Sequence, residues 1–354
     1  MKETLRVTGL MSGSSMDGVD LACCDLVTEE GSWSYRILAA RTFPYGIELR
    51  SKLETACHWS PEEINKLDLE LGTFYGQLIN RFHRKEKLRP AYISSHGHTI
   101  LHDPAKGITF QAGNGRIIAE KTGITVINDF RKEDVAQGGQ GAPLVPLGDK
   151  LLFSGFEGCL NLGGFANISF DDHGGTRTAY DLCPANMALN WVASLKGKTY
   201  DRSGVMGRSG VVRRDLLEQM NQLDFYRIRG PKSLGREWFL DQFLPILKQS
   251  RYPAEDLMAT LQEHLALQIS SGINEAGIGS LLVTGGGALN LSLMERIRKH
   301  TQAFMEIPEE SLLHYKEALI FALLGILRIR GEINCLSSVT GGRKDLSAGT
   351  IHRI

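Results

Sequence analysis

The sequence predicts an α/β protein of two domains, each built on a mixed β-sheet, that face one another across a cleft. The chain has 354 residues, and at roughly 100–200 residues per domain this length favours two domains. Strand and helix patterns alternate throughout, which is typical of layered α/β folds. Both halves begin with apolar strands around a glycine-rich turn, at residues 5–26 and 159–170. Such a pattern indicates an antiparallel hairpin.

In the first half, residues 5–26 are expected to form a strand, a tight turn and a second strand, followed by a second strand pair at 35–43. A helix should begin after Ser60, because Pro61 suits the first helical position and Glu63 completes a capping box. Apolar residues keep helical spacing to about residue 84. Short strands are expected at 91–95 and 124–128.

The second half starts after the strongest loop signal of the chain, Ala-Gln-Gly-Gly-Gln-Gly-Ala-Pro at 136–143. We expect the domain change near this loop. Strands at 159–162, 168–170, 178–180 and 281–284 alternate with helices at 186–195 and 257–273. The helix at 317–329 is apolar on nearly every side, which predicts that it is buried between layers.

Composition excludes several classes of protein. Lysine plus arginine total 40, as do aspartate plus glutamate, so bulk electrostatic binding of nucleic acid is disfavoured. The apolar run at 318–327 is too short to span a membrane, and the N-terminus does not match a signal peptide. Six scattered cysteines without a C-x-x-C pair indicate a reduced, cytoplasmic protein.

Three glycine-rich turns, each at the end of a strand, predict phosphate binding. Backbone N–H groups can approach a phosphate where no side chain blocks them. The turns contain Ser12, Gly13, Ser14, Ser15, Met16, Asp17 and Gly18; then Gly163, Gly164 and Asn167; and then Gly285, Gly286 and Gly287. Asp17 is placed to hold a magnesium ion through water. A single such turn is more often an ordinary hairpin, but three in one chain favour phosphate binding.

Other nucleotide and hydrolase motifs are absent from the sequence. The Gly-Lys-Thr at 197–199 lacks the first glycine of a P-loop, and no G-x-G-x-x-G or H-E-x-x-H occurs. No serine has glycine at both flanking positions of a nucleophile elbow. These absences favour a fold that binds phosphate through hairpin turns.

Two groups of titratable residues are candidates for chemistry. His96, His98 and His102 alternate along a strand and permit a metal site, but a hydrogen-bonding role is favoured. Asp181 follows the strand at 178–180 and can act as a general base. It can equally cap the next helix, and its position leaves both roles open.

Motifs along nearly the whole chain resemble those of the anhydro-N-acetylmuramic acid kinases, in the sugar kinase/heat-shock-70/actin superfamily. They are Gly-Leu-Met-Ser-Gly-Ser-Ser-Met-Asp-Gly-Val-Asp at 9–20, Ser-His-Gly-His-Thr at 95–99, Asp-Phe-Arg at 129–131, Gly-Gly-Gln-Gly-Ala-Pro at 138–143, Asn-Leu-Gly-Gly-Phe-Ala-Asn at 161–167, Asp181, Pro-Lys-Ser at 231–233, Gly-Arg-Glu at 235–237, Thr-Gly-Gly-Gly at 284–287 and Lys-Glu-Ala at 316–318. The motifs follow the family's order, and together they are highly specific.

The resemblance implies two actin-like ATPase domains around a deep interdomain cleft, at 1–130 with 331–354 and at 131–330. It implies a cytoplasmic, homodimeric kinase that uses ATP and Mg²⁺. The enzyme would hydrolytically open the 1,6-anhydro ring of 1,6-anhydro-N-acetylmuramic acid and phosphorylate O6. The product would be N-acetylmuramate 6-phosphate, formed in cell-wall sugar recycling.

The same resemblance implies roles for particular residues. Asp181 would be the base that activates water. The turn from Ser12 to Val19 would hold the β- and γ-phosphates and magnesium, the turn with Gly163, Gly164 and Asn167 would be the second phosphate loop, and Gly285 to Gly287 would lie at the adenosine. The sugar would contact His96, Thr99, Pro143, Asp181 and Glu317.

Two departures from the family pattern concern the sugar pocket. His98 stands where many relatives have glutamine. Asp-Leu-Cys-Pro-Ala-Asn at 181–186 lacks two glycines of the usual motif, which should stiffen this segment.

The alternatives to a kinase are a catalytically silent nucleotide-binding module and a metal-dependent hydrolase of the same fold.

Overall fold

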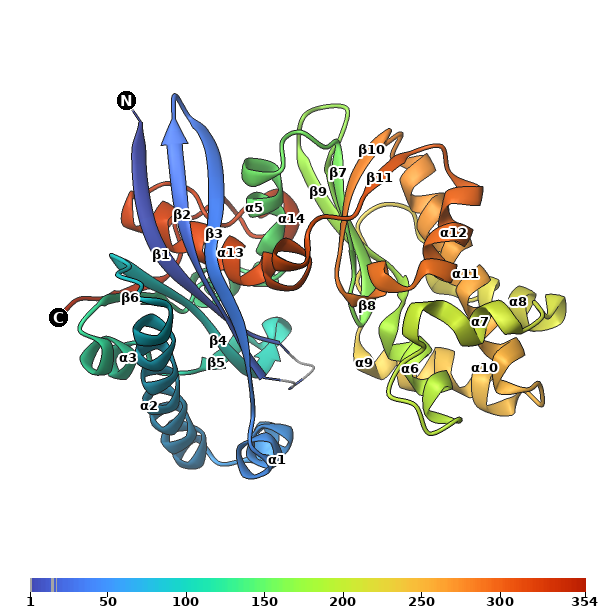
Figure 1. The fold of residues 1–354 in the computed structure, drawn as a ribbon, viewed down its shortest axis with the longest axis horizontal. Helices are drawn as coiled ribbons and strands as arrows, with labels where there is room; N and C mark the ends of the chain where they lie inside the picture. The colour runs from blue at the N-terminus through green and yellow to red at the C-terminus, as the bar shows by residue number, and fades with distance from the viewer. Residues whose placement is uncertain (1, 14–15, 17) are drawn as a thin grey trace. The chain divides into compact units, whose positions relative to one another are not determined.

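A computed structural model describes residues 2–13, 16 and 18–354, and the chain divides into two compact units (Figure 1). Unit 1 comprises Met1–Leu152 and Tyr315–Ile354, and unit 2 comprises Phe153–His314. Both units contain a mixed sheet with flanking helices, so the predicted α/β class is confirmed. Among the described residues, no helix combines the length and the apolar character needed to cross a membrane.

The sheet of unit 1 has seven strands in the order β12-β6-β4-β1-β2-β3, with β5 paired to β4. The strands are β1 (Glu3–Ser12), β2 (Gly18–Glu29), β3 (Ser32–Pro44), β4 (Tyr92–Asp103), β5 (Ile108–Ala112), β6 (Thr125–Asn128) and β12 (Thr350–His352). β1, β2 and β3 are antiparallel, whereas β4 is parallel to β1 and β6 is parallel to β4. The expected strand pair at 35–43 is wrong: a single strand, β3, lies there and pairs along β2.

One helix of unit 1, α2 (Pro61–Glu86), begins at the residue that the sequence predicts. The helices of this unit are α1 (Ile47–Thr55), α2, α3 (Gly115–Thr122), α4 (Lys132–Ala136), α5 (Val145–Leu152), most of α13 (Glu310–Ile329) and α14 (Ser337–Thr340). At the start of α2, the backbone N–H of Glu63 donates to the Ser60 hydroxyl, and the Glu63 carboxylate accepts from the Ser60 backbone. The capping box is therefore confirmed.

Helix α13 packs against its neighbours through glycines. A Cβ atom at Gly9 would overlap the carbonyl oxygen of Ala318, and one at Gly148 would overlap the Ile320 side chain. Gly325 faces the Ser94 side chain in the same way, and the Ser94 hydroxyl donates to the carbonyl of Phe321. The helix is buried, as predicted, and these close contacts fix its position on β1 and β4.

Unit 2 repeats the strand topology of unit 1. Its sheet has the order β11-β10-β7-β8-β9, with β7 (Gly158–Leu162), β8 (Phe165–Asp171), β9 (Arg177–Pro184), β10 (Ser280–Thr284) and β11 (Phe304–Glu306). The first three strands form an antiparallel meander, and the last two add in parallel beside its first strand. β1, β2, β3, β4 and β6 have the same order in unit 1, so the similar hairpins reflect a repeated architecture.

The helices of unit 2 surround a core that centres on α11. They are α6 (Asn186–Ser194), α7 (Val205–Ser209), α8 (Arg214–Asn221), α9 (Arg236–Trp238), α10 (Leu244–Gln249), α11 (Ala254–Glu275) and α12 (Leu291–His300). Leu261, Leu265 and Ile269 of α11 are fully buried in this core, and the helix packs against β9. Burial of this apolar surface is the main favourable contribution to the stability of the unit.

The boundaries of the two units differ from the expected domain limits at 130 and 331. Residues 131–152 and 315–330 belong to unit 1. The reason is packing between segments that are far apart in sequence: Gly148 contacts Ile320, and a buried ion pair joins Lys316 Nζ to Asp149 Oδ1 at 3.0 Å. β12 pairs with β6, so the C-terminal segment also joins the first sheet.

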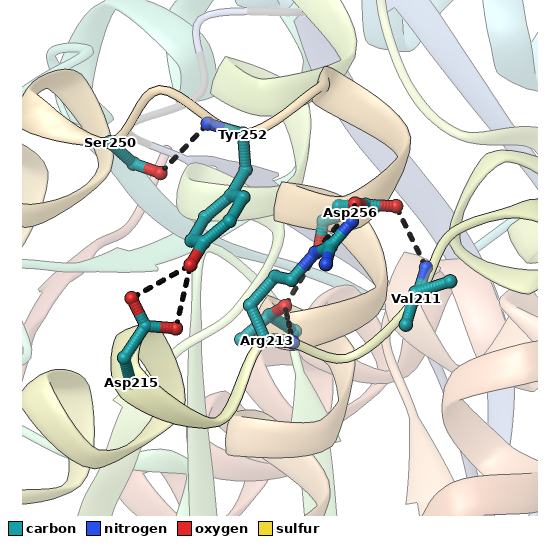
Figure 2. Close-up of polar contacts among 7 residues, drawn as sticks. Val211, Arg213, Asp215, Ser250, Tyr252 and Asp256 are labelled. Atoms are coloured by element: carbon teal, nitrogen blue, oxygen red, sulfur yellow. Dashed lines mark hydrogen bonds and ion pairs between the residues drawn. The ribbon is translucent and has the colours of Figure 1, made fainter.

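A polar cluster ties the start of α11 to the segment before α8 (Figure 2). Asp256 accepts from the backbone N–H of Val211 at 2.8 Å and from the guanidinium group of Arg213. The Tyr252 hydroxyl donates to the carboxylate of Asp215 at 2.8 Å, and the Arg213 guanidinium lies over the Tyr252 ring. The cluster fixes two loops through charge-assisted hydrogen bonds.

Asp256→Asn is expected to lower the melting temperature at neutral pH. The hydrogen bond from Val211 and the Arg213 guanidinium lower the pKa of Asp256 below its ordinary value. A lowered carboxyl pKa stabilises the fold above the pKa of the unfolded state, and this contribution is lost as pH falls through the folded pKa. The melting temperature of the variant should therefore lie below that of the wild type at pH 7, and the two melting temperatures should converge below about pH 4. Glu218→Gln, an exposed change on α8, is the control and should leave the melting temperature unchanged. If the melting temperatures of wild type and Asp256→Asn differed by the same amount at every pH, the charged carboxylate of Asp256 would not be the stabilising group.

Candidate functional site

The first glycine turn connects β1 to β2, and its first residue is held by a buried hydroxyl network. Ser12 Oγ lies 2.6 Å from the Tyr45 hydroxyl and 2.8 Å from His98 Nδ1. The Tyr45 and Tyr75 hydroxyls are 2.9 Å apart. Ser12 is buried, so its hydroxyl is already occupied within the fold and is not available to a phosphate.

The structure describes only some of the predicted residues of this turn. Ser14, Ser15 and Asp17 lie outside the described residues. The backbone N–H of Met16 donates to the carbonyl of Gly13, and Met16 has a positive φ of 56°. Gly18 and Val19 are the first residues of β2.

His98, which departs from the family pattern, belongs to the network around Ser12. Burial lowers its pKa to about 4, so the imidazole is neutral near pH 7. A neutral ring bonded to Ser12 and in edge contact with Tyr45 is a structural hydrogen-bonding group. This agrees with the hydrogen-bonding role that the sequence favoured for the histidines.

His96 and Arg131 form a second network in unit 1. His96 Nδ1 lies 2.9 Å from the carbonyl of Gly97, which can only accept, so Nδ1 carries the proton. Its Nε2 then accepts from Arg131 Nε at 3.0 Å. Another guanidinium N–H of Arg131 donates to the carbonyl of Gly141 at 2.7 Å. Both ring nitrogens of His96 are therefore engaged, which leaves neither available as a base or a metal ligand.

Glu317 lies near this network on α13. Burial raises its pKa, the nearby charges of Lys316 and Arg131 lower it, and those of Asp20 and Asp149 raise it. Burial lowers the pKa of Arg131 to about 10, so its guanidinium group remains charged at pH 7. The acidic and basic groups are suited to bind polar and charged atoms of a ligand.

The other two predicted sugar residues of unit 1 lie on different segments. Thr99 is half-buried in β4 opposite Gln111, and Pro143 is exposed before α5. β4 continues past the expected end at residue 95 through His96 to Asp103, and its pairing with β1 shifts register where Gly97 adopts a positive φ of 74°. Arg131 was not among the predicted site residues, although it lies in the Asp-Phe-Arg motif.

The second glycine turn, in unit 2, is bonded to the beginning of α6. The carbonyl of Gly164 accepts from the backbone N–H groups of Ala185 and Met187, and that of Gly163 accepts from Asn186. The Asn186 side chain donates to the carbonyl of Leu162 at 2.8 Å. The N-terminal amides of α6 are thus satisfied by this turn. Asn167, across the hairpin, is paired with Asn161.

Asp181 lies in β9 and presents a carboxylate of which one oxygen is held in place. Oδ2 accepts from the backbone N–H of Leu234 at 2.8 Å and from the Ser233 hydroxyl at 3.4 Å. Oδ1 has no hydrogen-bond partner within the part of the chain that the structure describes. Burial raises the pKa of Asp181, against the lowering effect of these two hydrogen bonds. The residue at the N-cap of α6 is Ala185, so Asp181 does not cap that helix.

A pocket of about 800 Å³ lies beside the third glycine turn in unit 2. Gly286 and Gly287 form part of its wall with Asn186, Tyr200 and His314. Gly285 has a φ of 84°, and a Cβ there would lie 2.7 Å from the carbonyl of Leu162. The volume and the mixed apolar and polar lining suit a ligand of nucleoside size. Tyr200 and His314 carried no motif, so sequence reasoning missed them.

The histidine metal site is not supported by the geometry. His102 is exposed and its Nδ1 lies 3.0 Å from the Thr109 hydroxyl. Within the described ranges, no group of three His, Cys, Asp or Glu residues is arranged to hold a metal ion. No observation favours the metal-dependent hydrolase among the alternatives.

Comparison with known proteins gives a consistent result. The family model described as "Anhydro-N-acetylmuramic acid kinase" matches residues 5–353. The anhydro-N-acetylmuramic acid kinase of Pseudomonas fluorescens (strain Pf0-1) is 36% identical over 363 residues, covering 97% of this chain and 98% of that protein. The protein of the same name from Pseudomonas paraeruginosa is 39% identical over 312 residues, covering 82% of each. Among solved structures, component A of (R)-2-hydroxyglutaryl-CoA dehydratase from Acidaminococcus fermentans is 14% identical, covering 91% of this chain and 97% of that one, with a TM-score of 0.46.

Proposed function

The chain belongs to the anhydro-N-acetylmuramic acid kinase family, and from this premise we propose that it opens and phosphorylates 1,6-anhydro-N-acetylmuramic acid at the expense of ATP. Water would attack the anomeric carbon, the bond between C1 and O6 would break, and O6 would take the γ-phosphoryl group. The products are N-acetylmuramate 6-phosphate and ADP. The reaction belongs to the recycling of cell-wall sugar.

The geometry of Asp181 is the observation that supports this proposal most. One carboxylate oxygen is fixed by Leu234 and Ser233, while Oδ1 has no partner in the described chain. An oriented carboxylate with an open oxygen suits a general base, and its raised pKa makes it a better proton acceptor than an ordinary aspartate. In the proposed reaction, Oδ1 takes the proton of the attacking water.

Ser233→Ala is expected to move the acidic limb of the pH profile of kcat/KM to higher pH. The Ser233 hydroxyl stabilises the charged carboxylate, so its removal should raise the pKa of Asp181 further. The base acts only when deprotonated, and the limb must follow its pKa upward. The measurement is sugar-dependent ADP release between pH 4 and 8, with normal turnover on the plateau. A limb that moves to lower pH would contradict the assignment.

The pocket in unit 2 is proposed to hold the adenosine of ATP. Its volume of about 800 Å³ and the glycines in its wall support this role. The two glycine turns, around Gly13 and Gly163, would face the phosphates. In phosphoryl transfer such groups act by positioning and by stabilising charge, without a covalent nucleophile.

A magnesium ion is also part of the proposal. Asp17 would hold the ion through water, and the ion would neutralise charge on the phosphates. The sugar would lie against Glu317, His96, Thr99 and Pro143.

Gly287→Ala is expected to weaken ATP binding and to destabilise unit 2. A Cβ at this position would lie 2.8 Å from Leu162 Cβ and 3.0 Å from its carbonyl oxygen, so the end of β7 must shift. Overpacking of this kind costs roughly 1–3 kcal/mol. Gly286→Ala is the matched control for the fold, because its nearest neighbour, Asn186 Nδ2, would be 3.8 Å away. Thermal melts and ATP titration should separate the two variants, and equal melting temperatures would contradict the packing argument.

The proposed reaction is tested by ADP release from Mg-ATP with and without 1,6-anhydro-N-acetylmuramic acid. We expect sugar-dependent turnover and one equivalent of a phosphate monoester, N-acetylmuramate 6-phosphate, for each ADP. ADP release without a phosphorylated sugar would contradict the transfer step. A folded protein that binds ATP but shows no sugar-dependent turnover would contradict the substrate.

The family also supports a cytoplasmic location and a homodimer. The reaction consumes ATP, which is a cytoplasmic metabolite, and none of the six cysteines forms a disulfide. Sedimentation velocity at micromolar concentration tests the oligomeric state: a species of one chain, 39.1 kDa, would contradict the dimer.

A further inference from the structure

A basic pocket lies at the C-terminal end of α2 in unit 1, apart from the residues discussed above. Its volume is about 630 Å³. It is lined by Asn80, His83, Arg84, Lys87, Leu88 and Arg89. Three of these six side chains are cationic and none is acidic. The chain as a whole has no net charge, so this concentration of positive charge is local.

The three cations of this pocket lack acidic partners. Arg84 Nε donates to the carbonyl of Asn80 at 3.3 Å, and among the described residues no carboxylate pairs with Arg84, Lys87 or Arg89. The neighbouring acid, Glu86, is instead paired with Arg41 at 3.3 Å. Three unpaired cations around one cavity repel one another, and an anion between them would relieve that repulsion.

His83 supplies an independent observation that points to a ligand. The side chain is 7% exposed, and Nε2 lies 2.8 Å from the Thr8 hydroxyl. Nδ1 has no partner in the described part of the chain, and it is not among the fully enclosed unpaired atoms of those residues. His83 lines the pocket, and its Nδ1 atom therefore retains accessible surface on a residue of the pocket wall. A buried polar group open to a cavity is available to a bound molecule.

The pocket lies at a helix C-terminus, where exposed carbonyls normally disfavour negative charge, but the backbone here reduces that effect. Lys87 adopts a left-handed conformation with φ 54° and ends the helix. Its N–H bonds back to the last turn, and the N–H of Leu88 donates to the carbonyl of His83 at 2.9 Å. These bonds satisfy terminal carbonyls, and the reversal brings Arg89 into the same cavity wall as Arg84.

We propose that this pocket binds a small polyanion that carries at least two phosphate or carboxylate groups. Three cations around one cavity match more than one anionic group, and a volume of about 630 Å³ accommodates a small metabolite. A bound anion would contact His83 in the pocket wall, and His83 is hydrogen-bonded to Thr8 in β1. Thr8 precedes Gly9 in β1, and this strand leads into the first glycine turn at Ser12.

The test is isothermal titration calorimetry of the whole protein with inorganic pyrophosphate and, separately, with citrate. The two probes distinguish phosphate from carboxylate ligands. We expect saturable binding at about 20 mM salt that weakens at 200 mM, because exposed charges are screened. Arg84→Gln with Arg89→Gln should weaken that binding about tenfold, because the double change removes two of the three cations and exposed ion pairs are individually weak.

Two further variants test whether weaker binding comes from a loss of folded structure instead of a loss of charge. Lys87→Gly removes a cation and relieves the left-handed conformation, so it should weaken binding while the melting temperature is kept or raised. Lys85→Gln, an exposed change on the same turn of α2 that does not line the pocket, should bind as wild type does. Absence of saturable binding for both probes would overturn the proposal. So would binding that the Arg84 and Arg89 changes leave unaltered.

Discussion

Asp181→Asn is expected to reduce sugar-dependent turnover by about 10²–10⁴-fold, which is the usual contribution of a general base. The amide keeps the size of the side chain and can still accept from Leu234 through its oxygen, but it cannot take a proton from water. ATP binding should be retained, because the pocket in unit 2 does not include this residue. The measurement is ADP release with saturating sugar, beside an ATP titration.

The same variant should be at least as stable as the wild type. Burial raises the pKa of Asp181, so the fold disfavours the charged carboxylate, and stability is lost as pH rises above the pKa of the unfolded state. A neutral amide avoids this loss at pH 7. Asp241→Asn, the same change at an exposed position of unit 2, should alter neither turnover nor melting. Full turnover in Asp181→Asn would show that Asp181 is not the general base. A lowered melting temperature of this variant would contradict the argument that the fold disfavours the charged carboxylate.

Gly9→Ala is expected to destabilise unit 1 by about 3 kcal/mol or more. A methyl group there would overlap the carbonyl oxygen of Ala318, and a backbone atom cannot rotate away. Inserting atoms into a packed core costs typically 1–3 kcal/mol, and this site lies at the upper limit because α13 itself must shift. For a unit of this size the change corresponds to a fall of roughly 6–12 °C in melting temperature.

Activity should fall with stability in Gly9→Ala, since α13 carries Lys316 and Glu317. Calorimetry and sugar-dependent turnover measure the two effects. Gly155→Ala is the matched control, because a Cβ there would meet no atom within 4 Å. An unchanged melting temperature in Gly9→Ala would show that β1 and α13 are less tightly packed than described.

Local chemistry was readable from the sequence. The capping box at Ser60 and Glu63 depends on residues three apart, and it is present as predicted. The two glycine hairpins were visible for the same reason, since strand, turn and strand are adjacent in the chain. The sequence left open whether Asp181 is a base or a helix cap, and the hydrogen bond from Leu234, 53 residues away, carried no sequence signal.

What the sequence missed depends on contacts between distant segments. The limits of unit 1 extend to Leu152 and Tyr315 because Asp149 and Lys316 form a buried pair across 167 residues. The burial of the Ser12 hydroxyl depends on Tyr45 and His98, which lie on other elements. Neither partner could be assigned from spacing, because only the folded sheet brings them together.

The bonding of the second glycine turn to α6 has a consequence for protein engineering. The carbonyls of Gly163 and Gly164 accept from the first backbone amides of the helix, and Asn186 donates to Leu162. The turn and the helix start therefore form one hydrogen-bonded unit, although 20 residues lie between Gly164 and Ala185. A chimera that takes the turn alone from a relative must re-form these three backbone hydrogen bonds with a helix start from another protein, whereas one that exchanges 158–194 as a block keeps both partners from the same protein.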